Sequence, residues 1–182
     1  MIRTLYPRIV DAQEAIDMIA LQQLVWTYCR AVDRRDLALL RSLYHDDAID
    51  DHGAMFRGGP DDYVAWLPSM LERWEATLHM IANMVFVIDG DEAEGELVVV
   101  ASHRTPPPDS RELVATGRYL DRYQRRDGVW RFFRRSLVLD WGDAAPISAA
   151  SLRPPRPGTE VGRPDRTDPS YLRLPMFARV PE

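Results

Sequence analysis

The sequence has little that would support a secreted, membrane-spanning or nucleotide-binding protein. Its one cysteine, Cys29, cannot form a disulfide within the chain, which favours a reducing compartment. No run of about eighteen apolar residues occurs, and residues 1–10 lack the apolar core of a signal peptide. The nucleotide motifs G-x-G-x-x-G and G-x-x-x-x-G-K-[ST] and the serine-hydrolase motif G-x-S-x-G are absent. We therefore expect a cytoplasmic protein that needs no membrane and no cofactor.

The charge balance argues against nucleic acid as a partner. The chain has 23 basic and 28 acidic residues, a formal net charge of −5. Such a surface repels phosphates and acidic membranes rather than collecting them. A length of 182 residues suits one domain that buries its own core.

The first part of the chain has the pattern of helices. Apolar residues recur at three- and four-residue steps over residues 11–32, which predicts an amphipathic helix. Asp11 is the expected N-cap, with Glu14 three residues later. Further elements are expected at 36–43 (helix), 48–52 (strand) and 61–74 (helix).

The second part has the pattern of an antiparallel sheet. Turn signals, such as Asp89-Gly90-Asp91, recur between apolar segments at the spacing of a meander. Strands are expected at 78–88, 95–105, 113–124 and 129–140. Helices first and a sheet second indicate an α+β domain.

The strand at 78–88 is apolar on both faces. Strict alternation places His79, Ile81, Asn83, Val85 and Val87 on one face. An antiparallel strand with no polar face must be shielded from solvent on both faces. The helices can cover one side, and we expect a second subunit to cover the other.

The end of the chain differs in composition. Residues 144–182 hold eight of the fourteen prolines and no regular apolar period. Two interpretations remain open, a disordered tail or an extended arm docked through apolar residues such as Tyr171 and Phe177. We divide the chain into a lead (1–10), a domain (11–143) and a proline-rich arm (144–182).

Histidines are the first candidates for chemistry, because their pKa lies nearest neutrality. His45 follows a helix end in a polar stretch and is expected to be exposed. His79 shares its strand face with apolar residues and Asn83, and His103 lies on the next strand. A buried histidine is more often a hydrogen-bonded core residue than a catalyst, so neighbours must decide.

Asp33 stands at the end of the first predicted helix, after apolar residues. An acid is poorly placed there, because the helix dipole is negative at that end, and a compensating partner is expected. Around the axis of an ideal helix, the side chain of Tyr28 lies about 140° from that of Asp33. The two side chains therefore face one cavity only if that cavity is wide or the helix loosens at its end.

The last strand carries adjacent arginines. Alternation sends Arg134 and Arg135 to opposite faces, so one of them points inward or lies at a bulge. An inward arginine needs an acid or an anionic ligand, which makes it a site candidate.

Polar residues in the middle of the chain could bind a metal ion instead of taking part in acid–base catalysis. Asp50, Asp51 and His52 offer hard oxygen and nitrogen ligands. No H-x-x-x-H or H-E-x-x-H spacing exists, and neighbouring strand residues face opposite ways. We do not expect a metal.

Four segments together resemble a known family, the SnoaL-like branch of the nuclear-transport-factor-2-like superfamily. They are WTYCRAVD (26–33), LYHDDA (43–48), LHM (78–80) and YQRRDGVWR (123–131). The resemblance runs from about residue 11 to residue 141 and leaves out the arm. It implies a cone of three N-terminal helices packed on a curved, mixed, mainly antiparallel sheet, with a closed hydrophobic pocket and a homodimer or homotrimer.

The resemblance also implies roles for particular residues. In members that catalyse eliminations, a helix-end aspartate orients a strand histidine that takes the proton, and an arginine on the last strand stabilises charge. Those roles fall on Asp33, His79 and Arg135, with Tyr28 as a further pocket residue. The expected substrate-binding residues are Trp26, Asn83, His103 and Phe133.

The reaction that follows is cofactor-free lyase, dehydratase or isomerase chemistry on a small hydrophobic cyclic molecule. Asn83 stands where a second histidine is expected after His79, which leaves the substrate open. Two other interpretations remain: a polyketide cyclase-like enzyme, and a non-catalytic ligand-binding protein or small subunit of a ring-hydroxylating oxygenase.

Overall fold

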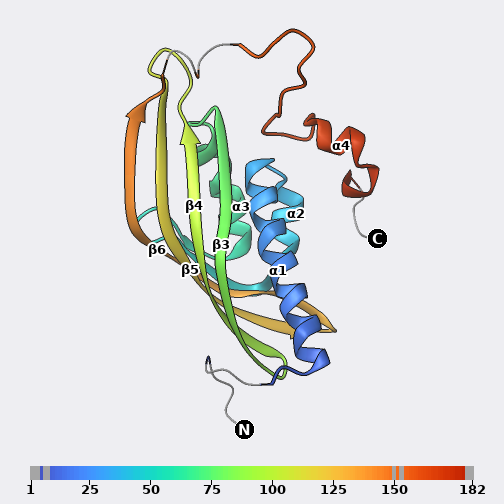
Figure 1. Ribbon diagram of the computed structural model, residues 1–182. Helices are drawn as coiled ribbons and strands as arrows, with labels where there is room; N and C mark the ends of the chain where they lie inside the picture. Colours follow the sequence, from blue (N-terminus) through green and yellow to red (C-terminus); the bar gives the residue numbers. More distant parts are fainter. Residues whose placement is uncertain (1–4, 6–8, 149–150, 152–153, 179–182) are drawn as a thin grey trace.

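The computed structural model describes residues 5, 9–148, 151 and 154–178 (Figure 1). Most of the predicted lead at 1–10 therefore lies outside the described residues. The elements are α1 (Ala12–Asp33), α2 (Leu37–Ser42), β1 (Tyr44–Asp51), β2 (Arg57–Gly58), α3 (Pro60–Leu71), β3 (Ala76–Asp89), β4 (Glu92–Arg104), β5 (Arg111–Arg126), β6 (Val129–Pro146), α4 (Pro169–Arg173) and the 3₁₀ helix η1 (Pro175–Ala178).

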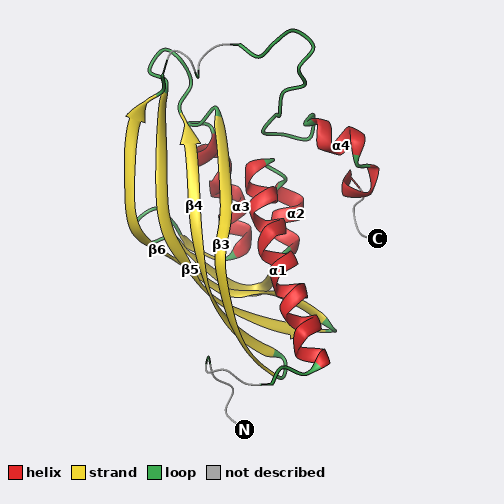
Figure 2. Cartoon of the chain, viewed as in Figure 1, coloured by secondary structure: helices red, strands yellow, loops and turns green. Residues whose placement is uncertain are grey.

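One curved sheet carries the fold, with strand order β2-β1-β6-β5-β4-β3. Strands β1 and β6 pair in parallel, and all other neighbours pair antiparallel. Helices α1, α2 and α3 lie on the concave side of this sheet, as Figure 2 shows. The predicted α+β class and the mixed, mainly antiparallel sheet are confirmed.

Local sequence signals set the ends of the helices. Asp11 caps α1 by accepting a hydrogen bond from the backbone N–H of Glu14 at 2.9 Å, as predicted. Asp36 caps α2 in the same way through the N–H of Leu39. Pro60 opens α3, where the first turn needs no backbone donor.

A bulge in β3 changes which of its side chains face the helices. The register with β4 shifts between Ile81 and Met84. A bulge inserts a residue and reverses the alternation beyond it. Val85 is therefore 47% exposed on the outer face. Asn83 is also exposed and does not share the side of the sheet that His79 faces, so its predicted place beside the histidine was wrong.

The narrow end of the concave side is filled with aromatic side chains. Rings from α1, β1, α3, β5 and β6 pack edge-on or tilted against one another, which favours aromatic contacts. The buried members are Tyr28, Tyr44, Tyr63, Tyr119, Tyr123 and Phe132.

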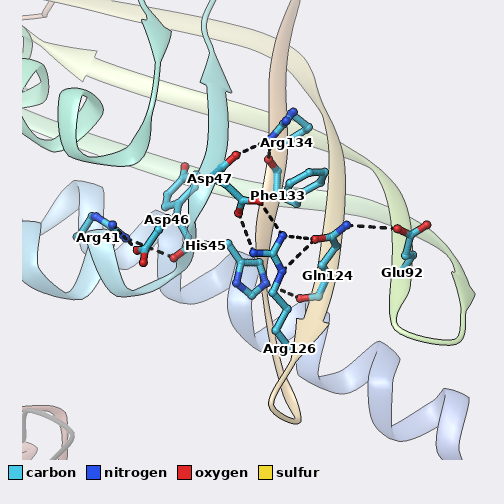
Figure 3. A network of polar contacts seen from close by, with 10 residues as sticks. Arg41, His45, Asp46, Asp47, Glu92, Gln124, Arg126, Phe133 and Arg134 are labelled. Carbon is cyan, nitrogen blue, oxygen red and sulfur yellow. Dashed lines mark hydrogen bonds and ion pairs between the residues drawn. The ribbon is translucent and has the colours of Figure 1, made fainter.

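A polar network fastens the start of β1 to the β5–β6 hairpin (Figure 3). Arg126 pairs with Asp47 at 2.8 Å. The ring Nε2 of His45 lies 2.8 Å from the backbone oxygen of Gln124. His45 is buried, and the expectation that it is exposed was wrong because the neighbouring hairpin covers it.

The C-terminal segment packs beside α1 and α2 (Figure 1). Tyr171 is buried and donates its hydroxyl to Asp36 at 2.8 Å. Arg166 pairs with the same carboxylate at 3.0 Å, and Arg34 pairs with Asp168 at 3.5 Å. Phe177 is 53% exposed, and the guanidinium carbon of Arg30 lies 4.9 Å from its ring centroid and from that of Tyr171. The contacts of this segment are therefore both polar and aromatic.

Candidate active site

The structure brings Asp33 and His79 together. The ring Nδ1 of His79 lies 2.7 Å from one carboxylate oxygen of Asp33. The backbone N–H of His79 donates to the other oxygen at 2.9 Å. The hydroxyl of Thr77 donates a third hydrogen bond at 2.9 Å. These donors compensate the unfavourable position of an acid at the end of α1.

The pair is mostly but not completely buried. The side chain of His79 is 10% exposed and that of Asp33 is 6% exposed. Within the described residues, Nε2 of His79 makes no hydrogen bond. With Nδ1 held by a carboxylate, Nε2 is the nitrogen available to exchange a proton with a bound molecule.

His103 lies directly beside the pair. Its ring centroid is 5.3 Å from that of His79 and 5.0 Å from that of Trp74. Burial lowers the pKa of His103 to about 4, and the neighbouring His79 acts in the same direction. His103 is therefore neutral at neutral pH. Its Nδ1 and the indole N–H of Trp74 are both buried without a partner among the described residues.

Small side chains lie next to His79 on the concave face. Across the sheet His79 is opposite Ala101, which is opposite Ala115, which is opposite Gly142. Leu139 of β6 pairs with Gly117, two residues along β5 from Ala115, and its side chain is 64% exposed. The sheet therefore offers an apolar surface beside the pair.

Arg135 belongs to the buried aromatic cluster and makes no direct contact with the pair among the interactions of the described residues. It is fully buried and makes two hydrogen bonds to Asp121, at 2.9 and 2.6 Å. Its guanidinium carbon lies 4.0 to 4.1 Å from the ring centroids of Tyr28, Tyr119 and Phe132. Burial alone would lower the pKa of this guanidinium, but the Asp121 carboxylate outweighs it and holds the pKa well above its usual value.

Tyr28 belongs to the same buried cluster as Arg135. Its hydroxyl lies 2.7 Å from the hydroxyl of Tyr63. Burial, followed by the nearby Tyr63 and Asp50, raises the pKa of Tyr28 well above its usual value. The predicted inward arginine is thus Arg135, and the acid that meets it is Asp121. Nη1 of Arg135 is buried without a hydrogen-bond partner among the described residues.

Two other predicted binding residues lie away from the pair. Trp26 is 49% exposed on α1. Phe133 lies at the register shift between β5 and β6, where the guanidinium of Arg134 is 4.0 Å from its ring centroid (Figure 3). A bulge here turns Phe133 away from the row of inward side chains.

A second histidine–carboxylate pair was missed as such. Nδ1 of His52 lies 2.5 Å from Asp50, whose other oxygen accepts the hydroxyl of Tyr44 at 2.6 Å. The spacing D-x-H at a strand end is the sequence signal for this pair, although from the sequence alone we considered these residues only as metal ligands. The described residues contain no cluster of three metal-ligating side chains.

Two hollows lie along strands β3 to β6, lined by residues other than the pair. The larger, of ≈ 410 Å³, is lined by outward residues of β3, β5 and β6, including Val85, Leu120 and Arg134. Neither this hollow nor the smaller one, at Val87, Tyr123 and Phe133, is lined by His79. No helix among the described residues is long and apolar enough to cross a membrane.

A curved, mixed six-stranded sheet with helices packed on its concave side is the architecture of the nuclear-transport-factor-2-like class. Residues 13–136 match the SnoaL-like domain family, and the chain belongs to this family. It is also 28% identical over 131 residues to an uncharacterized protein of Mycobacterium tuberculosis, covering 69% of this chain and 87% of that protein.

Two solved structures resemble the whole domain. A candidate scytalone dehydratase from Novosphingobium aromaticivorans has a TM-score of 0.65 and 24% identity, covering 80% of this chain and 97% of the other. A hexachlorocyclohexane dehydrochlorinase from Novosphingobium barchaimii has a TM-score of 0.69 and 22% identity, covering 80% and 100%. At this level of identity the likeness shows the fold.

Proposed function

We propose that the protein is a cofactor-free lyase or isomerase that acts on a small hydrophobic cyclic molecule, with His79 as the base. The observation that carries this proposal is the contact of 2.7 Å between His79 and Asp33. It fixes the ring orientation and stabilises the imidazolium that forms when Nε2 takes a proton.

The proposed step removes a proton from a carbon next to a carbonyl. The C–H electron pair then forms a carbon–carbon double bond. In a lyase a hydroxyl leaves from the adjacent carbon and departs as water once protonated, and in an isomerase the proton returns to another carbon. We assign the binding of a substrate oxygen to His103, because its ring is neutral and its centroid is 5.3 Å from that of His79.

The surroundings favour an apolar ring over a charged substrate. Ala101, Ala115 and Gly142 form a low, uncharged surface next to His79. The names of the two solved neighbours, a dehydratase and a dehydrochlorinase, refer to eliminations and agree with this reaction class. The printed sequence contains no lysine, so a lysine Schiff base is not available as an alternative to direct proton abstraction.

A non-catalytic binding protein is the second candidate. The observation that favours it is that Arg135, the expected charge-stabilising residue, is fully buried and paired with Asp121. On this alternative the apolar surface beside His79 would hold a ligand without converting it.

The test is a screen of cyclic ketones and alcohols for loss of water or a shift of a double bond, followed by mass spectrometry and ultraviolet absorbance. The wild-type protein is compared with His79→Ala, whose circular dichroism must match. We expect conversion by the wild type only. Equal conversion by both proteins excludes His79 as the base, and binding without conversion favours the second candidate.

A further inference from the structure

We propose that the C-terminal arm supports the pair of Asp33 and His79, and that Asp36 is the positioning residue through which the arm acts. The arm binds the turn between α1 and α2 (residues 33–36), and this α1–α2 turn also carries the carboxylate that holds His79. The effect of the arm on turnover rests on the proposed function, whereas its effect on the geometry of the pair does not.

The α1–α2 turn consists of charged residues only. Its sequence is Asp33-Arg34-Arg35-Asp36, so it has no apolar side chain to pack into the core. Its side chains instead make polar contacts with three other parts of the chain, which are β3, the segment after α3, and the arm. A hydrogen bond weakens steeply when its distance or angle changes. The position of the turn, and of Asp33 with it, therefore depends on these contacts.

Arg35 holds one side of the α1–α2 turn. Its backbone has a φ of +49°, a left-handed conformation that costs energy in a residue with a side chain. Its guanidinium donates to the backbone oxygens of Leu71 and Trp74 at 3.0 and 2.9 Å, which connects the turn to the segment between α3 and β3. A conformation of this kind persists only where the surrounding contacts hold it in place.

The arm holds the other side of the α1–α2 turn, and Figure 1 shows α4 beside α1 and α2. Asp36 is 5% exposed, and one of its oxygens accepts the hydroxyl of Tyr171 at 2.8 Å and a guanidinium N–H of Arg166 at 3.0 Å. Arg34 pairs with Asp168 at 3.5 Å. The arm thus presents an arginine to the aspartate of the turn and an aspartate to its arginine.

The arm also contacts the last turn of α1. The guanidinium carbon of Arg30 lies 4.9 Å from the ring centroids of both Tyr171 and Phe177. The same guanidinium donates to the hydroxyl of Ser170 at 3.1 Å. The contacts of the arm therefore converge on residues 30–36, which include the carboxylate of the pair.

Backbone hydrogen bonds connect the two ends of the α1–α2 turn. The N–H of Asp36 donates to the carbonyl of Ala31 at 2.8 Å, and the N–H of Arg35 donates to the carbonyl of Val32 at 3.1 Å. Ala31 and Val32 directly precede Asp33 in the chain. The two aspartates of the turn therefore belong to one hydrogen-bonded unit, and a displacement of Asp36 is passed on to Asp33.

The contact that the turn supports lies at the edge of the sheet. β3 is the last strand in the sheet order, so the N–H groups along one of its sides have no strand partner. The backbone N–H of His79 donates to Asp33 instead, at 2.9 Å. Because Asp33 binds this N–H and the imidazole together, loss of its position releases both.

The experiment releases the arm without changing the domain. The double variant Arg166→Gln, Tyr171→Phe removes both arm donors to Asp36, and Arg173→Gln is the matched control. Arg173 pairs with Glu160 inside the arm at 2.8 Å, at a solvent-exposed site away from the turn. Circular dichroism of each variant must match wild type. We expect a protease to cleave the arm about tenfold faster under native conditions in the double variant only.

Hydrogen exchange at the backbone N–H of His79 is the main readout. We expect it to become about tenfold faster in the double variant. The N–H of Val99, a buried residue of the inner strand β4, should be unaffected. Asp36→Asn keeps an oxygen to cap α2 but loses the charge, and should also speed exchange at His79. Arg166→Lys keeps a cation opposite Asp36 and should leave this exchange near the wild-type rate.

Three outcomes overturn the proposal. Faster cleavage of the arm with unchanged exchange at His79 means that the pair does not need the arm. Equal acceleration at His79 and Val99 means that the variant has only a weaker fold. Unchanged cleavage in the double variant means that the donors to Asp36 do not hold the arm.

Turnover separates this inference from the proposed function. On any cyclic ketone or alcohol that wild type converts, we expect kcat of the double variant to fall about tenfold with KM little changed, because Asp33 is displaced while the apolar surface beside His79 is not. If wild type converts no substrate, the proposed function fails, and exchange at His79 still decides whether the arm supports the pair. If the double variant keeps its full kcat, the inference fails alone.

Discussion

Asp33 binds both the backbone and the ring of His79, through its two carboxylate oxygens, at 2.9 and 2.7 Å. One carboxylate thereby fixes the start of β3 against the end of α1 and sets the orientation of the imidazole. The same contact serves the fold and the proposed chemistry.

Replacing Asp33 by Asn tests this contact. The amide keeps the size of the side chain but not the charge that stabilises an imidazolium. We expect kcat on any substrate found to fall by about 10²- to 10⁴-fold, with KM changed less. Thr77→Val, which removes only the third hydrogen bond to Asp33, is the matched control and should cost much less. Similar losses in both variants would mean that Asp33 acts mainly by holding the strand.

The lowered pKa of His103 should make the free energy of unfolding depend on pH. Its pKa is about 4 in the folded protein and near 6.5 in the unfolded chain. Between these values the unfolded state binds more protons, so this contribution is fully present above pH 6.5 and is lost as pH falls toward 4. The loss should amount to about 2–3 kcal/mol. Urea unfolding of wild type and His103→Asn from pH 7.5 to 4 checks it. Parallel curves would contradict the prediction.

The buried pair of Arg135 and Asp121 predicts a large loss of stability from a single change. Asp121→Asn leaves the guanidinium buried without its countercharge, which costs about 3–5 kcal/mol. Asp47→Asn, at the solvent-exposed pair with Arg126, is the control and should change the midpoint of urea unfolding little. A small effect of Asp121→Asn would mean that another group, such as Asp50, balances Arg135.

The C-terminal arm should be held mainly by Tyr171. Tyr171→Phe removes the hydroxyl that donates to Asp36 and should weaken docking by about 1 kcal/mol. Faster cleavage at 154–168 by a protease under native conditions would report it. Leu172→Ala, at a side chain that is 79% exposed, should leave the cleavage rate unchanged. Equal rates for wild type and Tyr171→Phe would indicate that Arg166 and Arg34 suffice.

The exposed apolar side chains on the outer face of β3 lead us to expect self-association of the chain. Leu78, Met80 and Val85 are each about half exposed there, and a face of this kind is costly to leave in water. We expect a homodimer or homotrimer by light scattering, and a monomer for Met80→Glu. Leu172→Glu, an equally apolar-to-acidic change on the arm, should leave the mass unchanged. A monomeric wild type would exclude this use of the face.

The sequence by itself determined the order of the main elements, the cap at Asp11, the hairpin turns and the need of Asp33 for a compensating partner, while His79 as that partner came from the family resemblance. These follow from local periods and from charges placed where they need compensation, which neighbours in sequence reveal. The tertiary structure decided the rest. A bulge in β3 moved Asn83 outward, Asp121 from another strand took Arg135, and Tyr63 from α3 placed His52 inside. Such outcomes depend on which strands and helices meet, and a one-residue shift of register reverses every side chain beyond it.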